Sequence, residues 1–118
     1  MNLILVFIGG GFGSVVRYAI TLIINKLAID FPLATLISNV VASFLIGLLT
    51  AGFARGNVTD AQRLLFATGF CGGFSTFSTF SNETLSLVQN GQYMTTFLNV
   101  VLNVVLCFGA TFWGLTYK

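Results

Sequence analysis

The chain has 118 residues, of which 56% are hydrophobic and only 7% are charged, with a formal net charge of +2. A soluble domain carries about 25% charged residues, so most of this surface does not face water. The small net charge and the absence of any Lys/Arg cluster argue against nucleic acid as a partner. Both cysteines lie in apolar stretches, which argues against a disulfide framework.

Four uncharged or nearly uncharged stretches cover residues 3–24, 31–54, 64–82 and 93–117. Each is long enough to cross the hydrocarbon core, which requires about 20 apolar residues in a helix. The linkers at 25–30, 56–60 and 90–92 are short. We therefore expect an all-α integral membrane protein with four transmembrane helices, forming a single domain over residues 1–118 and carrying no enzyme active site.

An even number of spans places both termini on one side of the membrane. That side would hold Arg55, Arg63 and Lys118, and the other side would hold Lys26. The bias is small; it leans toward cytoplasmic termini and permits insertion in both orientations. Many transporters enclose a pathway between two inverted halves, and this chain has about the size of one half. An antiparallel, dual-topology homodimer would supply the other half.

The first stretch contains the sequence GGGFG at residues 9–13 and one charge, Arg17. The glycines lack the G-x-G-x-x-G spacing of a dinucleotide site and do not follow a strand. The pairs Gly9/Gly13 and Gly10/Ser14 instead favour close helix packing. Arg17 either extends to the membrane interface or draws anions into a vestibule, and the sequence does not decide between these roles.

The second and fourth stretches each carry a polar stripe with a spacing of four residues: Thr35, Asn39 and Ser43, and Asn99, Asn103 and Cys107. Residues with this spacing share one helix face. A buried amide is costly unless it is hydrogen-bonded, so the stripes predict either contacts between helices or a hydrated pathway. Two stripes without a carboxylate favour a pathway, in which amide and hydroxyl donors replace the hydration shell of an anion.

The third stretch includes GFCGGFSTFSTFSNE at residues 69–83. Its glycines weaken a helix, and its hydroxyl groups compete for backbone hydrogen bonds. This composition favours a break in the third helix over the alternative, a seam of small residues for helix packing. Irregular backbone is tolerated in a bilayer only beside protein or a water-filled cavity. The carbonyl groups freed by a break are natural ligands for a small cation.

Phe74, Phe77 and Phe80 recur every three residues in the same segment. Phenylalanines in a span usually face lipid or the core, and spacing alone favours that interpretation. Their ring edges carry positive charge, however, and can stabilise an anion. The hydroxyl residues between the rings keep this second interpretation open.

In three of these segments the chain resembles the Fluc (CrcB) family of fluoride channels. The matching sequences are GGGFGSVVRY, ATLISNVVASFLIG and GFCGGFSTFSTFSNE, in that order. The resemblance implies a passive, fluoride-specific channel in the cell (inner) membrane that lowers cytoplasmic fluoride. It also implies an antiparallel homodimer with two pores and a central, structural Na⁺ that is not transported.

The resemblance assigns roles to individual residues. The carbonyl groups of Gly72 and Ser75 would bind the sodium ion, although Ser75 stands where the family usually has Thr. The ion pathway would involve the ring edges of two phenylalanines, the pore asparagine, the hydroxyl residues of the unwound segment, the polar residues of the fourth helix and the arginine of the first: Phe77, Phe80, Asn39, Thr35, Ser78, Thr79, Asn103, Cys107 and Arg17. The fourth-helix residues depart from those common in the family.

Two other functions fit a small membrane protein. A dual-topology, proton-coupled multidrug exporter would need a carboxylate deep in a span, and the only candidate, Glu83, is expected at the periphery. A non-conducting subunit of a larger complex would explain the small-residue seams. It would not explain two amide stripes beside a broken helix.

Overall fold

The computed structural model describes residues 1–117 and is all-helical over that range. Its elements are α1 (Asn2–Asn25), α2 (Leu33–Ala54), α3 (Asp60–Gln62), the π-helix η1 (Arg63–Cys71), α4 (Gly72–Phe74), α5 (Phe77–Gln89) and α6 (Tyr93–Thr116). Helices α1, α2 and α6 are long and apolar enough to cross a membrane. They coincide with the first, second and fourth apolar stretches of the sequence.

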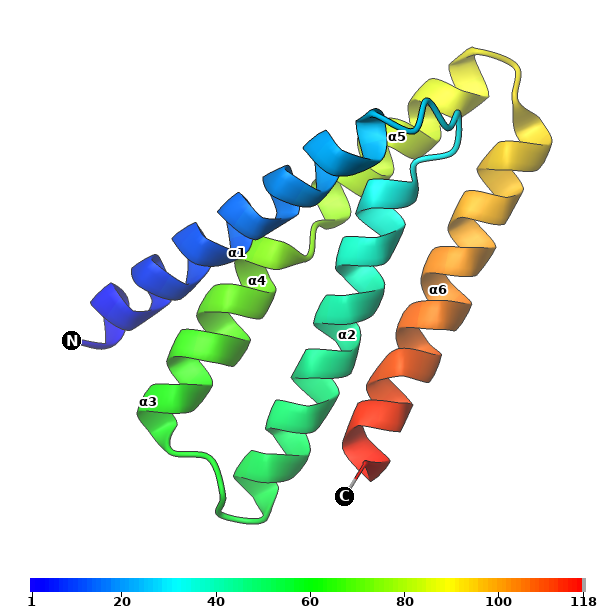
Figure 1. The fold of residues 1–118 in the computed structure, drawn as a ribbon. Helices are drawn as coiled ribbons and strands as arrows, with labels where there is room; N and C mark the ends of the chain where they lie inside the picture. Colours follow the sequence, from blue (N-terminus) through cyan, green and yellow to red (C-terminus); the bar gives the residue numbers. More distant parts are fainter. Residues whose placement is uncertain (118) are drawn as a thin grey trace.

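The helices form two closely packed pairs (Figure 1). Helix α2 lies beside α6 and runs in the same direction, while α1 packs across η1 and α4. The loops before α2 and before α6 lie at one end of the molecule, and the loop between α2 and α3 lies near the C-terminus at the other end. Helix α5 continues beyond α4 toward the start of α6, so residues 75–76 sit between the two pairs.

Glycines allow the backbones of α1 and η1 to touch. Gly9 and Gly13 are buried, and a Cβ atom added to Gly9 would lie 2.9 Å from the backbone nitrogen of Phe70. The same test at Gly69 places the added atom 3.0 Å from the Cα of Gly9. Such distances leave no room for a side chain, and this confirms the packing role expected for the glycines of the first helix. Gly47 and Gly114 make an equivalent contact between α2 and α6.

Helix α3 begins at a capping box. The side chain of Thr59 accepts a hydrogen bond from the backbone nitrogen of Gln62 (3.1 Å), and the Gln62 side chain accepts one from the backbone nitrogen of Thr59 (3.0 Å). These bonds satisfy two donors that a helix start leaves free. The polar residues at 57–60 therefore begin the third helical segment.

The interior mixes apolar and polar residues, whereas the exterior is largely apolar, unlike that of a soluble domain. The buried residues include Thr35, Ser38, Asn99 and Asn103, whereas Leu3 is 86% and Phe7 81% exposed. Large exposed hydrophobic side chains occur on every long helix. This distribution suits a chain whose outer surface contacts hydrocarbon.

Candidate functional site

Helical structure stops after Phe74 and resumes at Phe77. The two residues between are extended, with φ −83° and ψ 154° at Ser75 and φ −152° and ψ 120° at Thr76. Thr76 then caps α5, because its Oγ1 accepts a hydrogen bond of 3.1 Å from the backbone nitrogen of Thr79. The backbone groups of this extended pair cannot be satisfied by their own helix and need other partners.

Asn39, on α2, supplies two of these partners. Its Oδ1 accepts a hydrogen bond from the backbone nitrogen of Thr76 (2.9 Å), and its Nδ2 donates to the carbonyl oxygen of the same residue (3.4 Å). The side-chain amide thus pairs with an extended peptide much as a neighbouring β-strand would. The Nδ2 also donates to Oδ1 of Asn103, on α6, over 3.2 Å.

The carbonyl groups near the break differ in their hydrogen bonding. The Cys71 carbonyl oxygen accepts hydrogen bonds from the Ser75 nitrogen (2.9 Å) and hydroxyl (2.7 Å). The Gly73 carbonyl oxygen accepts one from Nε of Arg17 over 3.2 Å. The carbonyl oxygens of Gly72 and Ser75 accept no hydrogen bond from any residue in the range 1–117. These two oxygens are free to bind a small cation.

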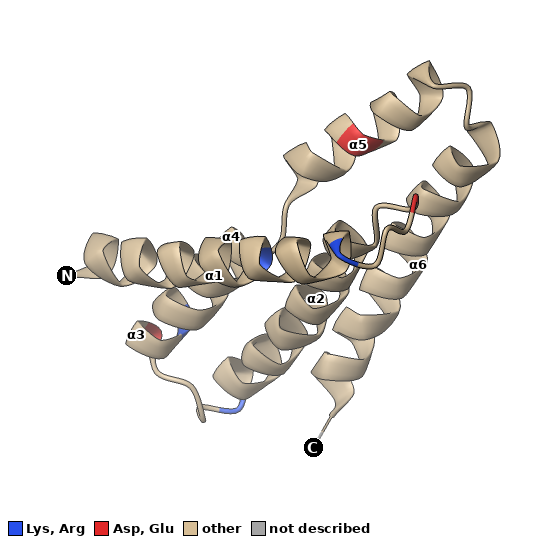
Figure 2. Ribbon diagram, turned by 45° about the horizontal axis from the view of Figure 1, so that its top comes forward, with Lys and Arg blue, Asp and Glu red and all other residues tan. Residues whose placement is uncertain are grey.

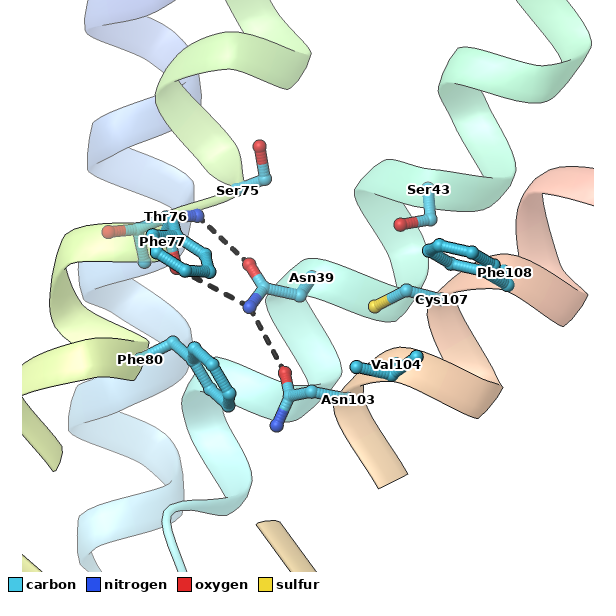
Figure 3. A pocket seen from close by; sticks show the side chains of 10 residues that line it. All are labelled: Asn39, Ser43, Ser75, Thr76, Phe77, Phe80, Asn103, Val104, Cys107 and Phe108. Carbon is cyan, nitrogen blue, oxygen red and sulfur yellow. Dashed lines mark hydrogen bonds between the residues drawn. The ribbon is translucent and has the colours of Figure 1, made fainter. Parts of the chain in front are cut away.

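A groove of about 290 Å³ lies beside the break, between α2, α5 and α6 (Figure 3). We call it the phenylalanine groove. The rings of Phe77 and Phe80 lie 5.6 Å apart at an interplanar angle of 46°. The groove brings together five of the residues that the sequence assigned to the ion pathway and adds five others: Asn39, Phe77, Phe80, Asn103 and Cys107, with Ser43, Ser75, Thr76, Val104 and Phe108.

The groove combines weak, neutral partners for an anion. Its polar groups are amides, hydroxyls, a thiol and backbone, and none of its lining residues is ionisable except Cys107. Amide N–H groups and ring edges both present positive charge to an anion without the strength of an ammonium group. The same surface offers no carboxylate to hold a cation or to carry a proton.

Thr35, Thr79 and Arg17 line a different cavity. This second cavity has a volume of about 220 Å³, lies between α1, α2 and α5, and also includes Glu83. Arg17 is the only basic residue of α1, and Figure 2 shows that charged residues are few and scattered along the helices and loops. The structure therefore does not place these predicted pathway residues in the phenylalanine groove.

One expectation for α5 needs correction. Ser78 and Thr79 were assigned to the unwound segment, but both lie in the first turn of α5. The reason is the Thr76 cap, which lets helical structure resume immediately. Glu83, further along α5, is only partly exposed, and its buried Oε1 atom makes no hydrogen bond within the described range.

Thr84 was missed by the sequence analysis. Its Oγ1 accepts a hydrogen bond of 2.9 Å from Nδ2 of Asn99. Asn99 is 1% exposed and does not line the phenylalanine groove, although it shares a stripe with Asn103 and Cys107. The spacing of four in α6 pointed to Asn99. Thr84 gave no such signal, because no polar residue lies four positions before or after it in α5.

The fold and the groove define a helical membrane protein with a groove of uncharged polar and aromatic side chains beside the break between α4 and α5. Residues 4–115 match the family described as "CrcB-like protein, Camphor Resistance (CrcB)". The chain belongs to the CrcB family.

Curated relatives carry a more specific name. The chain is 47% identical to "Fluoride-specific ion channel FluC" of Pyrococcus abyssi, over 97% of this chain and 95% of the relative. It is 48% identical to the protein of that name from Serratia proteamaculans (87% and 82% covered) and 44% identical to that of Escherichia coli O7:K1 (94% and 91%). The chain is thus a multi-pass membrane protein of a channel family and not an enzyme, and these relatives give no support to the multidrug exporter.

Proposed function

We propose that this chain is a fluoride-specific ion channel that lets fluoride leave the cell passively across the inner membrane. The observation that carries the proposal is the phenylalanine groove, in which Asn39 meets Phe77 and Phe80. The relatives named as fluoride-specific channels support the choice of fluoride. Chemistry alone does not separate fluoride from chloride, because amide donors and ring edges serve both.

Conduction requires binding that is favourable enough for entry and weak enough for exit. In the groove an anion would exchange its hydration shell for amide N–H groups and ring edges. Asn39 would be the principal donor, with an anion taking the place of one of the two oxygens to which its Nδ2 now donates. Asn103 and Cys107 would extend the polar surface along α6. The proposal keeps Thr35, Thr79 and Arg17 as a second part of the pathway in their own cavity. It also keeps Ser78, whose hydroxyl lies 3.3 Å from that of Thr76 at the break.

A single copy does not enclose the groove. Phe77 is 77% and Phe108 76% exposed, so the aromatic wall has an open side. We propose that a second copy, inserted in the opposite orientation, closes it and forms an antiparallel, dual-topology homodimer with two pores. The weak Lys/Arg bias between the two ends supports insertion in both orientations. Residues 60–89 would form the third of the four membrane spans, in two pieces joined at Ser75 and Thr76.

The free carbonyl oxygens of Gly72 and Ser75 suit a hard cation such as sodium. Four such oxygens, two from each copy, would meet at the axis of the proposed dimer and bind one Na⁺. Bound there, the ion would neutralise the carbonyl dipoles left by the two breaks and hold the copies together. It would lie away from both anion pathways and would not be transported.

Efflux from liposomes that contain only this protein tests the proposal. Liposomes loaded with potassium fluoride or potassium chloride are treated with valinomycin, and the released anion is followed with an ion-selective electrode. We expect rapid fluoride release and chloride release no faster than from protein-free liposomes. Fluoride release at the protein-free rate would overturn the channel assignment, and equal release of both anions would overturn its specificity.

A further inference from the structure

A continuous chain of side-chain hydrogen bonds leads away from Asn39 and out of the phenylalanine groove. Nδ2 of Asn39 donates to Oδ1 of Asn103 (3.2 Å), and Nδ2 of Asn103 donates to Oδ1 of Asn99 (3.0 Å). Nδ2 of Asn99 donates to Oγ1 of Thr84 (2.9 Å), whose hydroxyl donates to the carbonyl oxygen of Phe80 (2.6 Å). We call these three asparagines and Thr84 the amide chain.

Backbone groups fix the direction of every bond in the amide chain. In its middle, Nδ2 of Asn103 also donates to the backbone carbonyl oxygen of Asn99 (2.8 Å), which can only accept. At one end, the backbone nitrogen of Thr76 can only donate, so the atom of Asn39 facing it must be the oxygen. At the other end, the carbonyl of Phe80 can only accept, so it takes the single hydroxyl proton of Thr84. The Thr84 oxygen must then accept from Asn99, and the order of donor and acceptor follows from there.

Burial makes this order hard to reverse. Asn99 is 1% and Asn103 6% exposed, so water cannot replace a lost partner. Turning one amide by 180° would bring two donors or two acceptors face to face and leave a buried polar atom without a partner. Each amide therefore has one orientation that satisfies all its neighbours.

We propose that Asn99 and Thr84 are positioning residues that hold the Asn103 amide in place and, through it, keep the second N–H of Asn39 directed toward Asn103 in the groove. Figure 3 shows this orientation, with the oxygen of Asn39 at the break and its nitrogen between Thr76 and Asn103. Neither Asn99 nor Thr84 lines the groove, so both act through Asn103 and Asn39. The proposal rests on the proposed function, since the orientation matters because an anion needs the N–H groups.

Losing the Thr84 hydroxyl would leave the buried Nδ2 of Asn99 without an acceptor. The Asn99 side chain would then move toward another partner and would no longer hold the Asn103 amide in place. Asn39 would keep its anchor on the peptide of Thr76, but the oxygen that accepts its second N–H would be displaced, and with it the donor that the groove offers to an anion.

The substitution Thr84→Val removes the hydroxyl with little change in shape, and Thr84→Ser keeps it. Thr96→Val is the matched control, because the Thr96 hydroxyl donates only to the carbonyl of Gln92 in its own chain segment (2.8 Å). We expect Thr84→Val to slow fluoride efflux by about five- to tenfold, the value of one hydrogen bond. Thr84→Ser and Thr96→Val should conduct at the wild-type rate.

Side-chain NMR provides a second readout that does not need conduction. In protein labelled with ¹⁵N-asparagine, the NH₂ signals of Asn39 are assigned by their absence from Asn39→Gln. They should shift in Thr84→Val and stay in place in Thr84→Ser and Thr96→Val. If Thr84→Val fails to fold, Asn99→Leu interrupts the amide chain one residue closer to Asn39. It should slow fluoride efflux and shift the Asn39 NH₂ signals to the same extent.

The two proposals fail in different ways. Suppose that the wild-type protein conducts fluoride. The positioning role alone would then be overturned if Thr84→Val conducted at the wild-type rate with unshifted Asn39 signals. It would also be overturned if Thr84→Ser were as slow as Thr84→Val. A wild-type protein that releases no fluoride would overturn the channel assignment. The Asn39 signals would then decide the positioning role alone: a shift in Thr84→Val would support it, and no shift would refute it.

Discussion

Replacing Asn39 by aspartate changes one group and separates two roles of this side chain. One role is to accept a hydrogen bond from the Thr76 nitrogen, and the other is to supply a donor to the phenylalanine groove. Aspartate keeps an oxygen for the Thr76 nitrogen, so the 2.9 Å bond that anchors the break is retained. It replaces the donor nitrogen by a second oxygen. That oxygen would face the carbonyl of Thr76 and Oδ1 of Asn103, which now accept from Nδ2 over 3.4 and 3.2 Å. The anchor therefore survives while the groove loses its donor.

The electrostatic effect of this change exceeds the loss of hydrogen bonds. Each lost hydrogen bond is worth about 1 kcal/mol net. A carboxylate about 4 Å from an anion in the groove opposes it by about 4 kcal/mol at an effective dielectric constant near 20. That energy corresponds to a decrease of about a thousandfold in anion occupancy. We therefore expect Asn39→Asp to conduct fluoride at a rate close to that of protein-free liposomes.

The assay is fluoride efflux from liposomes, with Asn90→Asp as the matched control. Asn90 is exposed at the end of α5 and lies outside the phenylalanine groove. The control adds the same charge to the chain, so it should conduct at the wild-type rate. Efflux by Asn39→Asp within a few fold of wild type would show that no anion approaches this amide, and the groove would then not be the pathway.

The remaining predictions concern the rings, the helix contact and the cation. Phe77→Ile or Phe80→Ile should slow fluoride efflux by about tenfold or more without changing the elution volume on gel filtration, because a ring-edge contact is lost; Phe112→Ile, on the outer surface of α6, should conduct normally. Gly9→Val should lower the free energy of unfolding by about 1–3 kcal/mol, because its side chain would meet the backbone of η1, while Gly11→Val, with nothing within 4 Å, should unfold like wild type. Replacing Na⁺ by N-methylglucamine in purified protein should lower the melting temperature and weaken the dimer, and an unchanged melting temperature would argue against sodium at the break.

The sequence predicts the long helices well, because a membrane span depends on length and apolar content alone. Three of the four apolar stretches are single helices within two residues of the expected bounds. It also predicts that Gly9 and Gly13 pack closely. It does not predict their partners, which are the backbone of Gly69 for Gly9 and the backbones of Phe70 and Phe74 for Gly13, because two helix faces meet only in the folded protein.

The site was harder to predict, because it too depends on which helix faces meet in the folded protein. A spacing of four places Asn99, Asn103 and Cys107 on one face of α6, but it does not say which of them meets a groove and which is enclosed. The structure places Asn103 and Cys107 in the groove and buries Asn99 against Thr84. Likewise, a count of glycines and hydroxyls in residues 69–83 cannot show that Asn39 would bond to the peptide of Thr76.

The position of Arg17 explains how an anion could pass without being trapped. A guanidinium group in the phenylalanine groove would hold an anion strongly and slow its release. In the structure the Arg17 side chain instead donates to the carbonyl of Gly73, on the far side of the break, and lines the other cavity. Its charge thus compensates a carbonyl that the break exposes, and it can raise the local concentration of anions without contacting them in the groove. The groove itself is left with neutral donors, which is the condition for rapid passage.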